Sequence, residues 1–187
     1  MTSAVLDANV LYSAMLRDMF MRLAVGLVFQ PKWTDRIHTE WIENVLKNRP
    51  DLERDQLERT RRLMDTWAGE ALVQEYESLI PSLSLPDDND RHVLAAAITA
   101  QAPVIVTFNL SDFPESQLAP YGIRAMHPDA FLTELAYDVP DAFLAALRHH
   151  RYALRNPVRT PEQYIASFVD NGLFQIAGWL DQFKDRI

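Results

Sequence analysis

The fold is decided by residues 90–107, which read DRHVLAAAITAQAPVIVT. The first half predicts a helix from Arg91 to Ala100 that is almost wholly apolar, as expected of a helix buried on most sides. The second half, Pro103 to Thr107, is β-branched and apolar without alternation, which is typical of a central strand in a parallel sheet. A buried helix followed at once by such a strand indicates an α/β fold.

The alternation of strands and helices extends outward from this stretch. Short apolar runs predict strands over residues 3–7 and 122–126, and Leu72-Val73 favours another short strand. Helices are expected over residues 9–28, 34–48, 51–70 and 128–136, with a loop at 79–85. Strands joined by helices imply parallel pairing, so we expect an α/β/α sandwich with a central parallel sheet over residues 1–136.

The remainder of the chain, residues 137–187, shows no strand pattern. One helix is expected over roughly 140–155, and a last one over about 173–184. Between them, Thr160-Pro161-Glu162-Gln163 is a capping-box sequence, and Asn171-Gly172 is a typical helix end. We therefore expect a C-terminal helical extension packed on the first domain.

Composition excludes several classes of site. The chain has 187 residues and no cysteine, so thiolate metal sites, disulfide scaffolds and cysteine nucleophiles are ruled out. Five glycines leave little from which to build a phosphate-binding loop. The 26 acidic and 18 basic residues give a net charge of -8, which argues against binding nucleic acid by bulk charge. No segment has the pattern of a signal peptide or membrane span, and we expect a cytoplasmic protein.

The positions of four acids are the most informative feature. Asp7 ends the first predicted strand, Asp90 begins the buried helix, and Asp112 follows the strand that ends at Thr107. Ligand sites of parallel sheets lie outside the carboxyl ends of the strands, so these acids are expected at one edge. Glu40, in the middle of a helix, could point into the same cleft. Carboxylate oxygens suit a hard cation, Mg²⁺ or Mn²⁺.

Each acid also has a structural interpretation, which the spacing leaves open. Asp90 alone is most often a helix cap, and Asp7 alone could be a turn residue. Glu40 could be a solvated helix residue, and Glu43, one turn further on, competes with it for a place in the cleft.

Four segments together resemble the PIN-domain family of metal-dependent ribonucleases, many of whose bacterial members are VapC-like toxins. The resemblance covers roughly residues 3–135 and rests on residues 5–11, on Glu40-Trp41, on residues 90–97, and on residues 104–109 with Asp112-Phe113. It implies that Asp7, Glu40 and Asp90 are the family's three principal acids.

The fourth family acid is where this sequence departs from the pattern. Many members have Asp two residues after the threonine that matches Thr107, whereas this chain has Asn109. Asp112 is the nearest remaining carboxylate, so it could be a metal ligand, act through water or only cap a turn, while Asn109 could supply a neutral oxygen. Thr107 resembles the family's hydroxyl near the acids, or is simply a β-branched strand residue.

The resemblance implies an endoribonuclease that uses Mg²⁺ or Mn²⁺ and is the toxin of a type II toxin–antitoxin pair, with a cognate antitoxin protein and often a homodimer. A housekeeping RNA-processing nuclease is the alternative within the same chemistry. A catalytically weak PIN-fold protein-binding module is a third possibility, which Asn109 in place of Asp keeps open.

RNA would need a local basic surface on so acidic a chain. Arg148, Arg151 and Arg155 fall at helical spacing, and Arg17 and Arg91 are further candidates. Arginine beside aromatic residues can bind phosphates and stack bases. The same residues could instead form a solvated helix face or meet an acidic partner segment.

Overall fold

The computed structural model describes all 187 residues. Its centre is a four-stranded sheet with the order β2-β1-β3-β4, in which every pairing is parallel. The strands are β1 (Ser3–Leu6), β2 (Gln30–Lys32), β3 (Val104–Val106) and β4 (Arg124–Met126). Val5 pairs with Ile105 in the two central strands, and both side chains are fully buried. The predicted parallel α/β architecture is confirmed.

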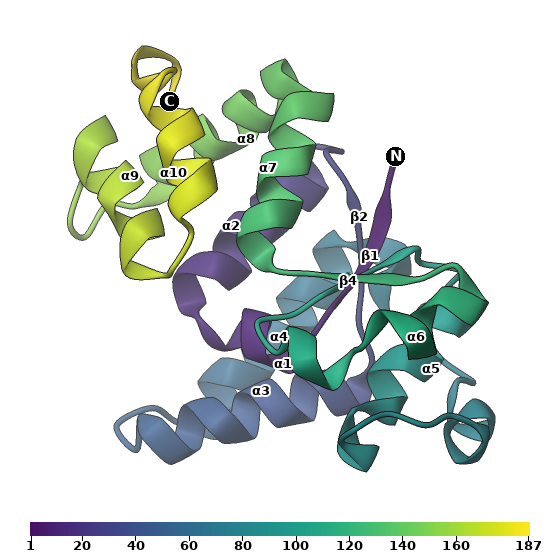
Figure 1. Cartoon of the computed structure of the whole chain (residues 1–187). Helices are drawn as coiled ribbons and strands as arrows, with labels where there is room; N and C mark the ends of the chain where they lie inside the picture. Colours follow the sequence, from purple (N-terminus) through teal and green to yellow (C-terminus); the bar gives the residue numbers. More distant parts are fainter.

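Ten α-helices surround the sheet. The first seven are α1 (Ala8–Tyr12), α2 (Ala14–Val25), α3 (Asp35–Asn48), α4 (Arg54–Trp67), α5 (Arg91–Thr99), α6 (Glu115–Leu118) and α7 (Pro128–Asp138). The last three are α8 (Pro140–Ala153), α9 (Pro161–Asp170) and α10 (Phe174–Asp181). Figure 1 shows helices on both sides of the strands, with α9 and α10 gathered at the side of the molecule away from α5. None of these helices is both long and apolar enough to cross a membrane.

Several predicted elements were wrong in detail. The helix expected over residues 9–28 is two helices, because Ser13 is extended and its hydroxyl caps α2 by accepting from the Leu16 amide at 3.4 Å. The helix expected over 51–70 is shorter and ends at Trp67. Leu72 forms only an isolated bridge with Trp33, and the expected loop at 79–85 begins inside a 3₁₀ helix that covers Glu77–Ser82.

The C-terminal helices pack on the rest of the molecule through polar as well as apolar contacts. Asp129 of α7 is buried, and its carboxylate accepts the backbone N–H groups of Gln175 and Ile176 at 2.8 and 2.9 Å. It thereby satisfies free donors at the start of α10. Ser13, between α1 and α2, donates to Asn171 at the end of α9 at 2.9 Å. These bonds fix the C-terminal helices against the sheet domain.

Candidate functional site

Asp7 lies immediately after β1, at the carboxyl end of the sheet. Its backbone N–H still pairs with the carbonyl of Val106 at 3.0 Å, so the carboxylate leaves the chain where β1 and β3 run side by side. Asp7 is also the N-cap of α1, since one carboxylate oxygen accepts from the Ala8 amide at 2.7 Å. The side chain is only 6% exposed. Asp7 is therefore both the turn residue and the edge carboxylate that the sequence suggested.

Thr107 and Asn9 hold the second carboxylate oxygen of Asp7. The Thr107 hydroxyl donates to Oδ2 at 2.7 Å, and the Asn9 amide donates to the same oxygen at 2.6 Å. Asn9 also donates to the Thr107 hydroxyl at 2.9 Å, and its carbonyl oxygen accepts from the Phe108 amide at 3.1 Å. This network fixes the orientation of Asp7 and joins the ends of two strands.

Glu40 reaches the same region from the middle of α3 and is half-buried, whereas Glu43 is exposed. Arg36, one turn earlier, donates to Oε1 of Glu40 at 3.0 Å and also to the carbonyl of Asn89 at 3.2 Å. Nε2 of the buried His92, on α5, lies 3.0 Å from the same Glu40 oxygen. Burial raises the pKa of Glu40, but His92 and Arg36 more than offset it, and the net pKa is lowered.

Asp90 precedes α5 at the end of the 3₁₀ turn Asp88–Asp90, and its carboxylate makes no capping hydrogen bond. The capping role at this turn belongs to Asp87, whose side chain accepts from the Asn89 amide at 2.8 Å. The structural interpretation of Asp90 as a helix cap therefore finds no support in the hydrogen bonds. Its oxygens are free for another ligand.

A 3₁₀ turn, Leu110–Asp112, follows β3; Asn109 precedes it and Asp112 is its last residue. Asp112 is half-buried and has a single long contact, with the Ser111 hydroxyl at 3.4 Å. Asn109 is exposed, and its backbone amide donates to the Thr107 hydroxyl at 3.0 Å. The backbone of Asn109 is thus held against Thr107, and neither the Asn109 nor the Asp112 side chain has a strong partner of its own.

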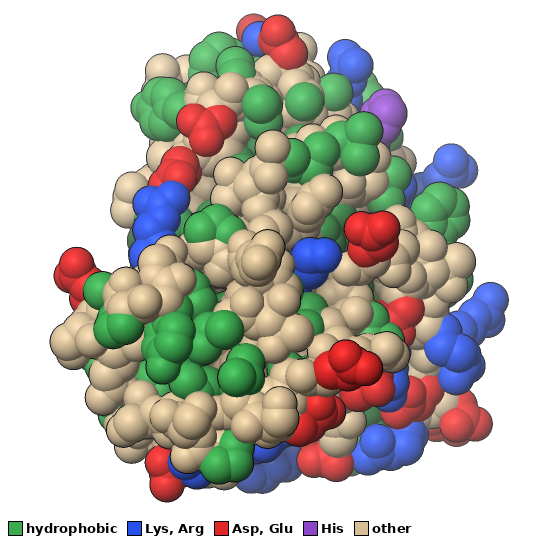
Figure 2. All heavy atoms as spheres, turned by 90° about the vertical axis from the view of Figure 1, so that its right-hand side faces the viewer, with side chains coloured by type: hydrophobic (Ala, Val, Ile, Leu, Met, Phe, Trp, Pro, Cys, Tyr) green, Lys and Arg blue, Asp and Glu red, His purple; other side chains and the backbone are tan.

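The acids influence one another electrostatically. The pKa of Asp90 is raised to about 7, first by burial and then by the negative charges of Asp7, Asp87, Asp112 and Glu40. Burial also raises the pKa of Asp7, against the opposing hydrogen bonds from Thr107 and Ala8, and the charge of Glu40 adds to the rise. Figure 2 shows acidic side chains, mixed with basic ones, over the lower half of one face of the molecule.

The types of ligand atom at this site suit a hard divalent cation. All its oxygens come from carboxylates, an amide and a hydroxyl, and like charges that raise one another's pKa are relieved by a cation. The side chains do not form a ready-made cage, because no three His, Asp or Glu side chains converge closely enough to hold an ion. A metal would have to draw Asp90 and its neighbours together.

The candidate arginines are in different surroundings. Arg17 is 8% exposed, donates to the carbonyl of Leu11 at 2.5 Å and stacks 4.3 Å over the ring of Trp41. Burial lowers the pKa of its guanidinium to about 10. Arg91 is half-buried and pairs with Asp88, 3.4 Å away. Arg148 and Arg155 are exposed, and Arg151 is half-buried.

Asn9 and His92 are site residues that the sequence analysis did not single out. Asn9 stands two residues after Asp7, a spacing that signals a side chain able to reach back to the strand end. His92 is the one ionisable residue within the apolar part of α5, at 1% exposure. An ionisable residue in an otherwise apolar helix could have marked His92 as a site residue. Its contact with Glu40 could not have been recognised, because the two residues are far apart in sequence.

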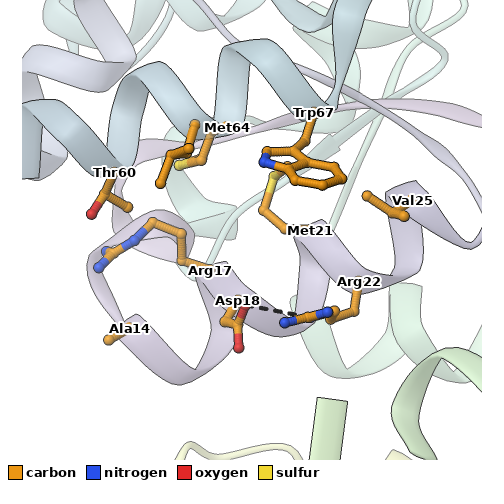
Figure 3. Close-up of a pocket in the computed structure, with 10 residues that line it drawn as sticks. Ala14, Arg17, Asp18, Met21, Arg22, Val25, Thr60, Met64 and Trp67 are labelled. Carbon is orange, nitrogen blue, oxygen red and sulfur yellow. Dashed lines mark ion pairs between the residues drawn. The ribbon is translucent and has the colours of Figure 1, made fainter. Parts of the chain in front are cut away.

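A separate hollow of about 400 Å³ lies between α2 and α4 (Figure 3). Its apolar lining includes Met21, Val25, Leu63 and Trp67, and Trp67 remains 66% exposed. A neighbouring hollow shares Trp67 and includes Leu27, which is 71% exposed. The charged residues that line the larger hollow are Arg17, Asp18 and Arg22.

Comparisons with known proteins match two family models over most of the chain. The family model described as PIN domain matches residues 3–111, and the model described as VapC50 C-terminal domain matches residues 128–182. A Mycobacterium tuberculosis (strain ATCC 25618 / H37Rv) protein named "Putative ribonuclease VapC50" is 60% identical over 45 residues. That match covers 24% of this chain and 27% of the relative, so it spans about a quarter of either protein. No solved structure matches the chain significantly.

Proposed function

This chain belongs to the PIN-domain family, and from that premise we propose that it is a metal-dependent endoribonuclease and the toxin of a type II toxin–antitoxin pair. The observation that supports the proposal is that the charges of Asp7, Glu40 and Asp112 all raise the pKa of Asp90, whose carboxylate makes no capping hydrogen bond. The relative's name, with its ribonuclease and VapC terms, supports the same activity.

Asp7 and Asp90 would hold Mg²⁺ or Mn²⁺, with Glu40 and Asp112 as further carboxylates of the set. A cation bound there supplies polarisation of a phosphate oxygen and a lowered pKa for a bound water. Asn109 could add a neutral oxygen.

The chain's own residues would perform the remaining steps. Thr107 and Asn9 keep Asp7 in one orientation by donating to its Oδ2. Glu40, whose pKa is kept low by His92 and Arg36 against the effect of burial, stays ionised and would orient the attacking water and accept its proton. Asp112 is the second candidate for that role. In-line attack on phosphorus would then displace the 3′ oxygen of the ribose.

The partner proposed for the hollow between α2 and α4 is a segment of the cognate antitoxin. Exposed Trp67, Leu63 and Val25 favour apolar side chains. Asp18 pairs with Arg22, so the lining keeps one net positive charge, that of the mostly buried Arg17, which favours an acidic residue beside the apolar ones. An amphipathic segment with an acidic flank therefore fits this hollow. A homodimer is a further proposal from the family, which light scattering of the purified chain would test.

We also propose the division of the chain into a nuclease domain, 1–136, and a helical extension, 137–187. The second family match begins at Pro128, the first residue of α7. This helix contacts both parts, because Phe131 packs against Phe29 and Asp129 accepts from the amide of Gln175. A cytoplasmic location is proposed on the same family grounds.

Expression of the wild type and of Asp7→Asn, each with and without the product of the adjacent gene, tests the function. Growth arrest with specific RNA fragments only for the wild type without its partner would support the toxin. RNA processing without arrest would favour the housekeeping nuclease instead. Metal binding with no cleavage at all would favour the protein-binding module.

A further inference from the structure

Residues 148–159 carry an unusual concentration of positive charge. This segment contains four arginines, Arg148, Arg151, Arg155 and Arg159, and neither Asp nor Glu. With 18 basic and 26 acidic residues in the whole chain, the other residues carry a net charge of -12. The segment is therefore a local positive region on a strongly acidic protein.

None of these four arginines pairs with a carboxylate, whereas eight arginines elsewhere in the chain do. Arg148 and Arg155 are exposed. The Nε donor of Arg151 is buried and has no hydrogen-bond partner. Unneutralised guanidinium groups with free donors are suited to binding an anion with several oxygens, such as a phosphate.

The segment is held in shape rather than left to solvent. It comprises the last turns of α8 and the connection to α9, where Arg155 and Val158 form an antiparallel bridge. Nη1 of Arg151 donates to the carbonyl of Arg159 at 2.8 Å, which ties the connection to the helix. Because the backbone is held in this way, binding a ligand costs little backbone freedom, and the cost is confined to the exposed arginine side chains.

An aromatic ring lies within the same surface. Tyr152 is 63% exposed, and the guanidinium of Arg151 lies 4.5 Å from the centre of its ring. Val158, in the same segment, is 75% exposed. Arginine charge combined with an exposed aromatic ring is the combination by which proteins bind single-stranded RNA. An acidic protein segment would be bound by the charges but would not need the exposed ring.

We propose that residues 148–159 form a second RNA-binding surface, separate from the acidic cluster, which binds the phosphates and a base of the RNA substrate. This inference rests on the proposed function for the identity of the ligand. In Figure 1, α9 and α5 lie at opposite sides of the molecule, so the surface would hold RNA away from the site of cleavage. It would offset the repulsion between the RNA and the otherwise acidic chain.

The test measures RNA binding in the Asp7→Asn background with EDTA present, so that neither cleavage nor metal contributes. The double variant Arg148→Gln/Arg155→Gln removes two exposed arginines whose side chains make no hydrogen bond within the protein. The matched control is Arg59→Gln/Arg62→Gln on α4, which removes two exposed arginines that also lack an ion pair. Fluorescence anisotropy of a labelled single-stranded RNA is followed as a function of salt.

Each arginine that neutralises one phosphate of a single strand contributes about 0.7 to the salt slope of log K, so the slope of the double variant should be lower by about 1.4. Binding at 0.1 M salt should weaken roughly ten- to thirtyfold, while the control changes little. Equal weakening in both variants, or undetectable binding by the parent at low salt, would overturn the proposal. So would intact RNA binding combined with failure to bind the antitoxin. Cleavage by the wild type is assayed separately, so a failure of the nuclease assignment would be seen independently.

Discussion

The Thr107 hydroxyl donates a hydrogen bond of 2.7 Å to Oδ2 of Asp7, although the two residues are 100 positions apart. This bond joins the ends of the two central strands and fixes the acid on which the proposed chemistry depends. The same hydroxyl accepts from the side chain of Asn9 and the amide of Asn109. One small side chain therefore serves three polar groups at the site.

Replacing Thr107 by valine should destabilise the fold and impair cleavage. The change keeps the shape but leaves buried polar groups without a partner, which costs about 1–3 kcal/mol. Urea unfolding and RNA cleavage are measured together. Thr107→Ser retains the hydroxyl and should recover most of both properties, and equal behaviour of the valine and serine variants would contradict this account.

Asp90→Asn should stabilise the metal-free protein at pH 8 while abolishing cleavage. Because the folded-state pKa of Asp90 is raised to about 7, its contribution to stability is present below about pH 4 and is lost as pH rises through 7. The gain from neutralising this half-exposed group should be about 1 kcal/mol after allowance for solvent screening.

Thermal unfolding with and without Mn²⁺ checks the same residue. The wild type should gain thermal stability on addition of the ion, and Asp90→Asn should gain little. An equal shift in both proteins would show that the ion binds elsewhere.

Asp112→Asn should lower the pKa of Asp90, since the charge of Asp112 is one of those that raise it. Carbon-detected NMR titration of the Asp90 carboxyl measures the change directly. Asp141→Asn, in an exposed residue that pairs with Arg186 on the C-terminal helices, is the control and should leave that pKa where it is. An unchanged Asp90 pKa in Asp112→Asn would separate Asp112 from the acidic cluster.

Trp67→Glu should abolish binding of the antitoxin without affecting folding. The ring is 66% exposed, so little core packing is removed, while a new negative charge would repel an acidic partner segment. Tyr121→Glu, at a ring that is 46% exposed outside the hollow, is the matched control. Calorimetric titration measures the affinity of each variant for the antitoxin. Tight binding by Trp67→Glu would place the interface elsewhere.

The stability of the protein should depend on the contact between Asp18 of α2 and the buried His150 of α8, whose Nε2 lies 3.3 Å from Oδ2 of Asp18. His150 is the largest cause that lowers the pKa of Asp18. A lowered folded-state pKa stabilises above the unfolded value near 4, and this stability is lost as pH falls through the folded-state pKa. Asp18→Asn should therefore lower Tm at pH 7, and this effect should fade as pH falls through the lowered folded-state pKa of Asp18, whereas exposed Asp138→Asn should have little effect throughout.

The sequence predicted the central strands because their residues are unambiguous. Val104, Ile105 and Val106 are β-branched and fully buried, and no helix would use such a run before Thr107 and the turn. The edge strand β2 was missed because Gln30-Pro31-Lys32 has no apolar or β-branched signal, and proline is tolerated there only because edge strands need fewer ladder bonds. The local sequence pattern therefore predicts the central strands of the sheet but not its edge strand β2.

The site divides in the same way. Acids that follow strands could be placed at one edge from topology alone, as Asp7 and Asp112 were. Contacts between helices could not be predicted in this way. The approach of His92 to Glu40, for example, depends on how α5 and α3 are rotated about their axes. Likewise, burial of Arg17 against Trp41 follows from the break at Ser13, which the regular spacing of apolar residues concealed.

The most direct test of the central claim is a time course of RNA cleavage by purified wild type and Asp7→Asn in the same Mg²⁺ or Mn²⁺ buffer. The account predicts cleavage by the wild type that EDTA stops, and a decrease of at least about a hundredfold in Asp7→Asn, with circular dichroism showing both proteins folded. Full cleavage by folded Asp7→Asn, or cleavage by the wild type that persists in EDTA, would contradict it.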